Sequence, residues 1–411
     1  MGKILVSMNT KIYLFVIYFF SFQLTAVYAQ QDTKKNDILN PENIAGETYG
    51  QKLESLLFWT QEEREQRFPQ MQNIFPNAKV EKGNPLEVYK LEENKQIQPL
   101  WEDETTVESY ITDNHIAGLI VLQNNQIKLE AYGENVNKNS LWTSFSVAKS
   151  ISSMLLGIAL KEGDIKSLED ELQAYIPELK GHDYGKVTVR QLLTMTSGIA
   201  WNEDYEDPKA DVAQMYQAPC VGSEAHILTY MKKLKFKENG QKEWNYSTGE
   251  TDLLGILIQK ATRKSLSAYL SEKIWKPWGM ENDAFWLADE CSDLNLGGSG
   301  LSASLRDFAR LGTVMLNSGK KEGLELFSTE WLENATQPLF KTNENSDSGY
   351  GYLWWRNQDG SYLAAGIFGQ MIYINPEKNL VIAQNATWPQ ASSMELVKKR
   401  QKFIEAVQKV L

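Results

Sequence analysis

The stretch W-T-S-F-S-V-A-K-S-I-S-S-M-L-L-G-I-A-L-K-E-G, from Trp142 to Gly163, contains a run of apolar and small residues that decides the fold. Lys149 is the one charged residue between Ala148 and Leu160. A helix made of such residues has no face suited to solvent, so we expect it at the centre of a domain. We place its start near Ser146, with Ser144 as its cap, and its end at Gly163.

Two reactive groups occupy the first turn of this predicted helix, the Ser146 hydroxyl and the Lys149 amine. Their i, i+3 spacing puts them on one face. Burial disfavours a charged lysine, and a neutral amine beside a hydroxyl is a base beside a nucleophile. The helix N-terminus also offers N–H groups to an oxyanion. The S-x-x-K pattern also arises by chance, and its second copy, Ser318 with Lys321, lies in a polar turn that we discard.

Length and composition describe an ordinary globular protein. The 411 residues allow two or three domains, or one domain with a large insertion, and 42% of them are hydrophobic and 23% charged. The net charge of −11 disfavours nucleic acid as a partner, because phosphate contacts need a basic face.

Histidine and cysteine are scarce. The three histidines lack metal-ligand spacing and the two cysteines are isolated, so we expect no metal and no other cofactor. Two cysteines alone do not decide whether Cys220 and Cys291 form a disulfide.

The N-terminus has the pattern of a secretory signal peptide. Lys3 and Lys11 precede an apolar run from Ile12 to Val27, and small residues lead to an expected cleavage site after about Ala29. We therefore predict a signal peptide over 1–29, a periplasmic or secreted protein and no membrane span after cleavage. An uncleaved N-terminal anchor is the alternative, although the run is short for a span.

The order of predicted elements indicates an α+β fold. A polar, flexible lead is expected over 30–57, and a β-hairpin follows from Ile116 with its turn at Asn124-Asn125. Further strands are predicted at 351–355, 362–365, 370–375 and 380–384. Helices are predicted at 165–179, 187–195, 223–234, 251–261, 304–317 and 394–411. Strands at both ends and helices between them predict one antiparallel sheet flanked by helices, formed by 58–165 and 297–411, with a mainly helical insertion over 166–296.

Two later segments are candidates for the rest of a site. Tyr246 lies in W-N-Y-S-T-G-E, a loop that opens a second apolar helix, and could meet Ser146. A lone tyrosine is more often structural. Gly366 and Gly369 flank a strand entrance in A-A-G-I-F-G-Q-M, where glycines let a substrate approach backbone N–H groups. An ordinary turn is the alternative there.

Together these motifs resemble the serine β-lactamase and penicillin-binding-protein superfamily, in its class C-related branch, and most closely the 6-aminohexanoate-dimer hydrolases. The resemblance rests on S-V-A-K at Ser146, Y-S-T at Tyr246 and G-I-F-G at Gly366, in the order and surroundings typical of the family. L-L-T-M-T-S-G-I from Leu192 and the glycine-rich stretch from Gly297 support it.

The resemblance implies a role for each matching residue. Ser146 would be the acylated nucleophile, Lys149 its base, and Tyr246 the group that passes a proton to the leaving group. The backbone N–H groups of Ser146 and Ile367 would form the oxyanion hole. The candidates for substrate binding are Tyr205, Gly366 and Phe368.

The sequence also departs from the β-lactamase pattern. Thr248 stands where Y-x-N has an amide, and G-I-F-G replaces the K-T-G motif, so the cation that holds a β-lactam carboxylate is missing. Lys341-Thr342-Asn343 lacks the glycine and lies in a polar stretch. Both departures argue against efficient antibiotic hydrolysis.

We therefore predict a serine hydrolase that cleaves an ester or amide of a small molecule through an acyl-enzyme. The enzymatic alternatives are a D-amino-acid peptidase and a weak β-lactamase. A Ser-His-Asp hydrolase is disfavoured because G-x-S-x-G is absent from the sequence. The alternative of another class is a catalytically inactive binding protein of the cell envelope. The sequence leaves the substrate and the oligomeric state open.

Overall fold

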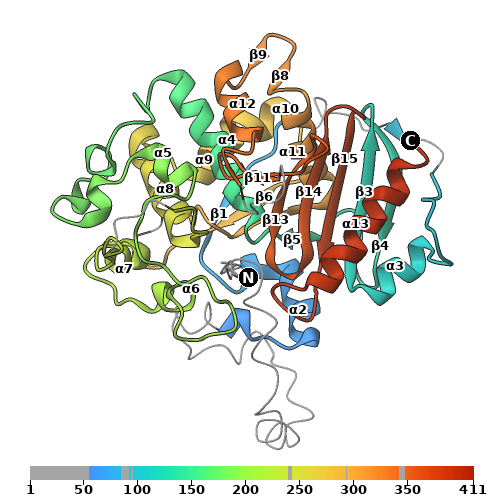
Figure 1. The fold of residues 1–411 in the computed structure, drawn as a ribbon, viewed down its shortest axis with the longest axis horizontal. Helices are drawn as coiled ribbons and strands as arrows, with labels where there is room; N and C mark the ends of the chain where they lie inside the picture. Colours follow the sequence, from blue (N-terminus) through green and yellow to red (C-terminus); the bar gives the residue numbers. More distant parts are fainter. Residues whose placement is uncertain (1–54, 85–91, 94–95, 239–242, 293, 342–347) are drawn as a thin grey trace, which may run out of the picture.

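A computed structural model of the protein describes residues 55–84, 92–93, 96–238, 243–292, 294–341 and 348–411. Its largest feature is a nine-stranded sheet with the order β10-β11-β12-β13-β14-β15-β3-β4-β2 (Figure 1). Neighbouring strands are antiparallel except β2 and β4. The strands are β2 (Glu92–Glu93), β3 (Ile116–Gln123), β4 (Gln126–Tyr132), β10 (Phe340–Lys341), β11 (Gly349–Tyr350), β12 (Trp355–Arg356), β13 (Tyr362–Gly366), β14 (Gln370–Asn375) and β15 (Leu380–Ala386).

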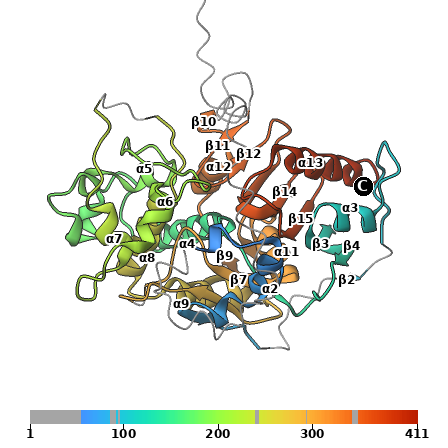
Figure 2. The same cartoon turned by 90° about the horizontal axis from the view of Figure 1, so that it is seen from below.

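Helices cover both faces of this sheet. Along β3, Ile120 and Leu122 join the main core, whereas Leu119 and Val121 join a second cluster with Phe403. Successive side chains of a strand point to opposite faces, so an apolar run without alternation indicates a strand buried on both sides. Figure 2 shows α13 (Met394–Gln408) and α3 (Val107–Asp113) on one face and α11 (Leu305–Leu316) on the other. The predicted hairpin, the α+β class and the covering C-terminal helix are confirmed.

The central helix is α4 (Val147–Glu162), in which every residue from Val147 to Ala159 is buried. Its predicted end is confirmed, because Gly163 adopts the left-handed conformation with φ of +82°. The predicted cap is wrong. Ser146 itself is the N-cap residue, and the Ser144 hydroxyl donates to the Phe145 carbonyl instead. Phe145 has φ of +44°, so the helix can begin only after it.

A second, four-stranded antiparallel sheet was not predicted. Its order is β1-β6-β7-β5, and its strands are β1 (Asn77–Val80), β6 (Ala284–Leu287), β7 (Leu301–Ser304) and β5 (Leu141–Thr143). Segments of three or four residues are too short to show an alternating pattern. The expectation of one sheet is therefore wrong, and β6 lies inside the segment 166–296 that was expected to be mainly helical. The boundaries of that insertion stay a prediction.

The middle of the chain carries the helices that complete the site. They are α5 (Val189–Leu193), α6 (Asp211–Gln214), α7 (His226–Met231), α8 (Thr248–Thr262), α9 (Leu266–Leu270) and α10 (Lys276–Trp278). The helix expected at 165–179 is instead two 3₁₀ turns, Leu172–Ala174 and Pro177–Leu179, because proline cannot continue a helical hydrogen-bond ladder. The strand expected at 351–355 is also wrong, since a turn with Leu353 at φ of +62° separates β11 from β12.

Cys220 and Cys291 form a disulfide, which answers the question that the sequence left open. The bond joins the segment after α6 to the segment after β6, across 71 residues of sequence.

The N-terminal predictions fall mostly outside the described residues. The predicted signal peptide over 1–29 lies outside them, as does the lead up to residue 54. Residues 55–57 are helical and Leu56 is buried, so these three belong to the folded body and not to a flexible lead. Among the residues that the structure describes, no helix combines the length and the apolar character needed to cross a bilayer.

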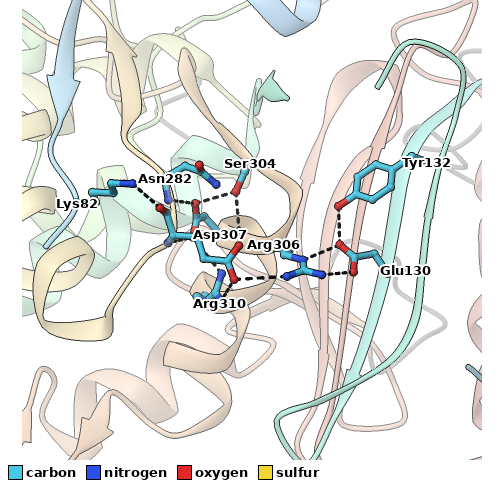
Figure 3. A network of polar contacts seen from close by, with 9 residues as sticks. Lys82, Glu130, Tyr132, Asn282, Ser304, Arg306, Asp307 and Arg310 are labelled. Carbon is cyan, nitrogen blue, oxygen red and sulfur yellow. Dashed lines mark hydrogen bonds and ion pairs between the residues drawn. The ribbon is translucent and has the colours of Figure 1, made fainter. Parts of the chain in front are cut away.

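A buried polar network joins α11 to the small sheet (Figure 3). The Asp307 carboxylate accepts the backbone N–H groups of Glu281 at 2.7 Å and Asn282 at 3.0 Å. It also accepts the Ser304 hydroxyl at 2.7 Å and pairs with Arg310 at 3.2 Å. Asp307 and Arg310 are both fully buried. The carboxylate thus holds the turn before β6 against the start of α11.

A second part of the network reaches the large sheet. The Arg306 guanidinium donates to both carboxylate oxygens of Glu130 on β4, at 2.7 and 2.6 Å, and the Tyr132 hydroxyl donates to the same carboxylate at 2.6 Å. Figure 3 shows Arg306 between Asp307 on one side and Glu130 on the other. Helix α11 therefore links both sheets through two consecutive residues of its first turn, Arg306 and Asp307.

We expect Asp307→Ala to lower the free energy of unfolding by about 3–5 kcal/mol, because it removes one of the two carboxylates that pair with the buried Arg310 guanidinium and the acceptor of the Glu281 and Asn282 N–H groups. Urea unfolding followed by circular dichroism measures this. Glu395→Ala, which removes the exposed ion pair with Lys399, is the control and should leave the unfolding midpoint unchanged. Equal midpoints for the two variants would contradict the role of the network.

Candidate active site

Ser146 lies at the junction of β5 and α4, two elements that fix it from opposite sides. The backbone of Phe145 just before it is left-handed, an uncommon conformation for a residue with a bulky side chain. Burial of the Phe145 ring against Phe68 and Phe368, with ring centroids 4.9 and 5.4 Å apart, holds that turn in place. The hydroxyl of Ser146 therefore stands at the N-terminus of a buried helix, at the positive end of its dipole. The N–H groups of Val147, Ala148 and Lys149 already donate to the carbonyls of residues 144–146.

The Lys149 amine has three hydrogen-bond partners. Its Nζ lies 2.9 Å from Ser146 Oγ, 2.9 Å from Thr248 Oγ1 and 2.9 Å from the Gly298 carbonyl. The side chain is buried. Desolvation lowers the pKa of Lys149 to about 8, although the charges of Glu203 and Asp252 act in the opposite direction. The predicted contact between the base and the hydroxyl is thus present, and a large fraction of the amine is neutral near pH 8.

Glu203 controls the direction of these hydrogen bonds, and no motif in the sequence pointed to it. Its carboxylate accepts both the hydroxyl and the backbone N–H of Thr248, the latter at 2.8 Å. It also accepts the Tyr205 hydroxyl at 2.7 Å and the Trp201 indole N–H. The Thr248 hydroxyl has one proton, so its oxygen can only accept from Lys149.

The direction of these bonds aims the lone pair of the amine. A neutral amine has two N–H groups and one lone pair. The Gly298 carbonyl can only accept, and the Thr248 oxygen accepts as well, so these two partners take the two N–H groups of Lys149. The lone pair is then left for the proton of Ser146. This is the geometry that a general base requires.

Tyr246 lies beside this pair. The Lys149 Nζ is 5.2 Å from the centroid of the Tyr246 ring. Burial and the nearby charge of Glu203 raise the pKa of Tyr246, while a hydrogen bond with Ser146 lowers it. The ring stacks on Trp355 with centroids 5.8 Å apart. Tyr246 is therefore a fixed, protonated phenol next to the serine oxygen, and the expected proximity of Tyr246 to Ser146 is present.

The end of β13 lies against the backbone of the nucleophile. A Cβ added at Gly366 would lie 2.6 Å from the Ser144 carbonyl oxygen and 3.2 Å from the Ser146 nitrogen, so only glycine fits. Ile367 follows it and lines the same pocket as Ser146. This arrangement places the two predicted oxyanion-hole residues on one wall.

Phe368 does not lie where a substrate could touch it. Its side chain is buried among Phe68 and Phe145, and the Arg64 guanidinium lies 4.9 Å from its ring centroid. The prediction that Phe368 binds substrate is replaced by a structural role beneath the nucleophile turn. The sequence G-I-F-G does not indicate whether the Phe368 ring points toward the pocket or into the core.

A pocket opens next to Ser146. Apolar side chains form most of its wall, among them Leu56, Leu57, Met71, Val212 and Leu287. Hydroxyl groups form the rest, including those of Tyr205, Tyr216 and Thr248. Tyr205, predicted to bind substrate, thus lines the pocket and contacts Glu203.

Helix α8 carries two buried carboxyl groups near the site, those of Asp252 and Glu250. Asp252 accepts the Gly298 N–H at 2.7 Å and the Tyr216 hydroxyl at 3.2 Å, and burial raises its pKa to about 7. Burial likewise raises the pKa of Glu250 to about 8. The acidic residues in T-G-E-T-D, at the start of an apolar helix, were the signal that could have identified them.

One group of metal-ligand type occurs among the described residues, formed by Cys220, His226 and Cys291. Its two sulfur atoms are joined in the disulfide. None of these three residues lines the pocket beside Ser146.

The chain is similar to several known proteins. A 6-aminohexanoate-dimer hydrolase from Paenarthrobacter ureafaciens is 25% identical over 338 residues, which cover 78% of this chain and 85% of that protein. A solved Bacillus anthracis structure, provisionally named as a 6-aminohexanoate-dimer hydrolase, superposes with a TM-score of 0.73 at 25% identity, over 84% of this chain and 93% of that one. A family VIII carboxylesterase shares the fold, with a TM-score of 0.56 at 15% identity over 74% of this chain and 96% of that one.

The family model named Beta-lactamase matches residues 104–403, a range that includes Ser146, Lys149, Tyr246 and Glu203. The resemblance inferred from the three motifs is confirmed by this match. Because it spans well over half of the sequence, the chain belongs to the beta-lactamase family.

Proposed function

We propose that the protein is a serine hydrolase that cleaves an ester or amide bond of a small molecule through an acyl-enzyme on Ser146. The contact between the buried Lys149 amine and the Ser146 hydroxyl, at 2.9 Å, carries this proposal. A binding protein has no use for a lysine held neutral against a serine. The hydrolase names of the family relatives support the same reaction class.

In the proposed mechanism each proton has a defined route. Lys149 takes the proton of Ser146 as Oγ attacks the substrate carbonyl carbon, and the resulting oxyanion is held by the N–H groups of Ser146 and Ile367. Tyr246 donates its proton to the leaving alcohol or amine as the carbon–heteroatom bond breaks, and regains one from Lys149. Water then attacks the acyl-enzyme by the reverse proton path and releases the acid and free Ser146.

Intact mass spectrometry tests the acyl-enzyme. The wild type and Ser146→Ala are exposed to a fluorophosphonate, to p-nitrophenyl acetate and to a cephalosporin. We expect an adduct from the first two reagents in the wild type and none in the variant. A stable cephalosporin adduct would favour a penicillin-binding activity instead. Folded protein with no adduct from any reagent would overturn the proposal and favour a binding protein.

We further propose that the folded body works outside the cytoplasm, in the periplasm or as a secreted protein. The Cys220–Cys291 disulfide supports this, because such bonds persist mainly in oxidising compartments. Cell fractionation of the native host, with the mass of the isolated protein, tests both the compartment and cleavage after about Ala29. Full-length protein in the cytoplasm with two free thiols would contradict the proposal.

The pH dependence of kcat/KM should report Lys149. The base is active when neutral, so activity should rise with pH, level off above the pKa of about 8, and be lost as pH falls below it. Lys149→Arg keeps a cation at every pH and should lower kcat/KM by about 10²–10⁴-fold. A profile that is flat between pH 6 and 9 in the wild type would exclude Lys149 as the base.

Glu203→Gln should change that profile in a defined direction. The Glu203 charge raises the pKa of Lys149, so its removal should move the rising limb of kcat/KM to lower pH. The plateau should also fall by about tenfold, because Thr248 is less firmly oriented. Glu206→Gln, at an exposed position in the same loop, is the matched control and should leave the limb in place. A lower plateau with an unmoved limb would show that Glu203 is only structural.

A further inference from the structure

Among the residues that the structure describes, no charged side chain lines the pocket beside Ser146. Its lining within the described residues consists of aliphatic and aromatic groups, hydroxyls and one glycine. Leu57, Val212 and Leu287 come from three separate parts of the chain and meet there. A site of this kind favours apolar groups, because burying a charge without a partner is costly.

The hydroxyl groups in the wall do not offset this apolar character. The Tyr205 hydroxyl donates to Glu203 at 2.7 Å, and the Tyr216 hydroxyl donates to Asp252 at 3.2 Å. Carboxyl groups therefore stand directly behind the polar part of the wall. An anionic group in the pocket would meet them at short range, and repulsion would add to its desolvation cost.

The pocket lies on the acyl side of the reacting bond. The leaving group has to meet its proton donor, and Tyr246 is not among the residues that line the pocket. Instead Tyr246 faces an aromatic group of Trp244, Tyr350 and Trp355, with ring centroids 5.8–6.4 Å from its own. Ser146 and Ile367, which would hold the carbonyl group, do line the pocket. The part of the substrate that extends into it is thus the acyl chain.

From these observations we infer that the enzyme selects substrates with a neutral, apolar acyl chain and discriminates against acyl chains that end in a charge. This inference rests on the proposed function, since it describes the acyl group carried by Ser146. It separates this chain from any enzyme whose acyl group ends in a carboxylate or an ammonium group.

A matched series of p-nitrophenyl esters tests the inference. The first set is acetate, butyrate and hexanoate. The second set keeps the six-carbon chain and places a carboxylate (adipate monoester) or an ammonium group (6-aminohexanoate) at its end. We expect kcat/KM to rise about fourfold for each methylene buried from acetate to hexanoate. The adipate monoester should fall at least 100-fold below hexanoate, and 6-aminohexanoate at least tenfold below it.

Substitutions at two neighbouring residues test whether the pocket itself selects the acyl chain. Leu57 is half-buried and lines the pocket, whereas Phe58 beside it is 47% exposed and does not. We expect Leu57→Lys to reduce the ratio of hexanoate to adipate activity at least tenfold, because it places a cation in the wall of the pocket. Phe58→Lys adds the same charge outside the pocket and should leave the ratio unchanged. Fluorophosphonate labelling of Ser146 shows that each variant retains a folded site.

The outcomes distinguish this inference from the proposed function. If no ester is hydrolysed and Ser146 takes no label, the proposed function fails. If hydrolysis depends on Ser146 but acetate or a charged ester is the best substrate, the inference fails and the function stands. Equal effects of Leu57→Lys and Phe58→Lys on the ratio would also overturn it, because the charge would then act from the surface.

Discussion

The burial of one amine determines most of the structure around the site. Lys149 has its nitrogen in the core, where desolvation lowers its pKa to about 8. Such a group is tolerated only where its hydrogen bonds are complete. Thr248, Gly298 and Ser146 complete them, from α8, from the loop before β7 and from the start of α4. All three elements must meet at the Lys149 amine. The fold and the proposed chemistry therefore depend on the same requirement, which is that this buried amine has a complete set of hydrogen bonds.

Much of the fold was readable because its elements are long and apolar. The central helix, the β3–β4 hairpin and the strands β14 and β15 carry patterns that residue type alone reveals. The small sheet escaped prediction because β5 and β7 have only three and four residues. Its pairing is set by which distant segments meet, which no local pattern encodes. The helix predicted at 165–179 is wrong for a local reason, because the effect of Pro177 on helix continuation was underestimated.

The residues of the candidate site likewise comprise some that local sequence predicts and some that it does not. Ser146, Lys149 and Tyr246 were identified because each lies in a short motif beside an apolar helix. Glu203 was missed because its role depends on a contact with Thr248, 45 residues away in sequence. Phe368 was misassigned because its ring turns into the core behind the nucleophile. Motifs thus locate the groups that we propose to react, whereas the residues that orient those groups become visible only when the chain is folded.

The central claim is that Lys149 is a neutral base at working pH, and direct titration tests it most simply. Protein labelled with ¹³C at the lysine ε-carbon would be titrated by NMR, with Lys149→Arg used to assign the signal. The account predicts one lysine with a midpoint of about 8, well below the ordinary lysine pKa of about 10.4. A Lys149 signal that titrates with the ordinary lysines would contradict the account.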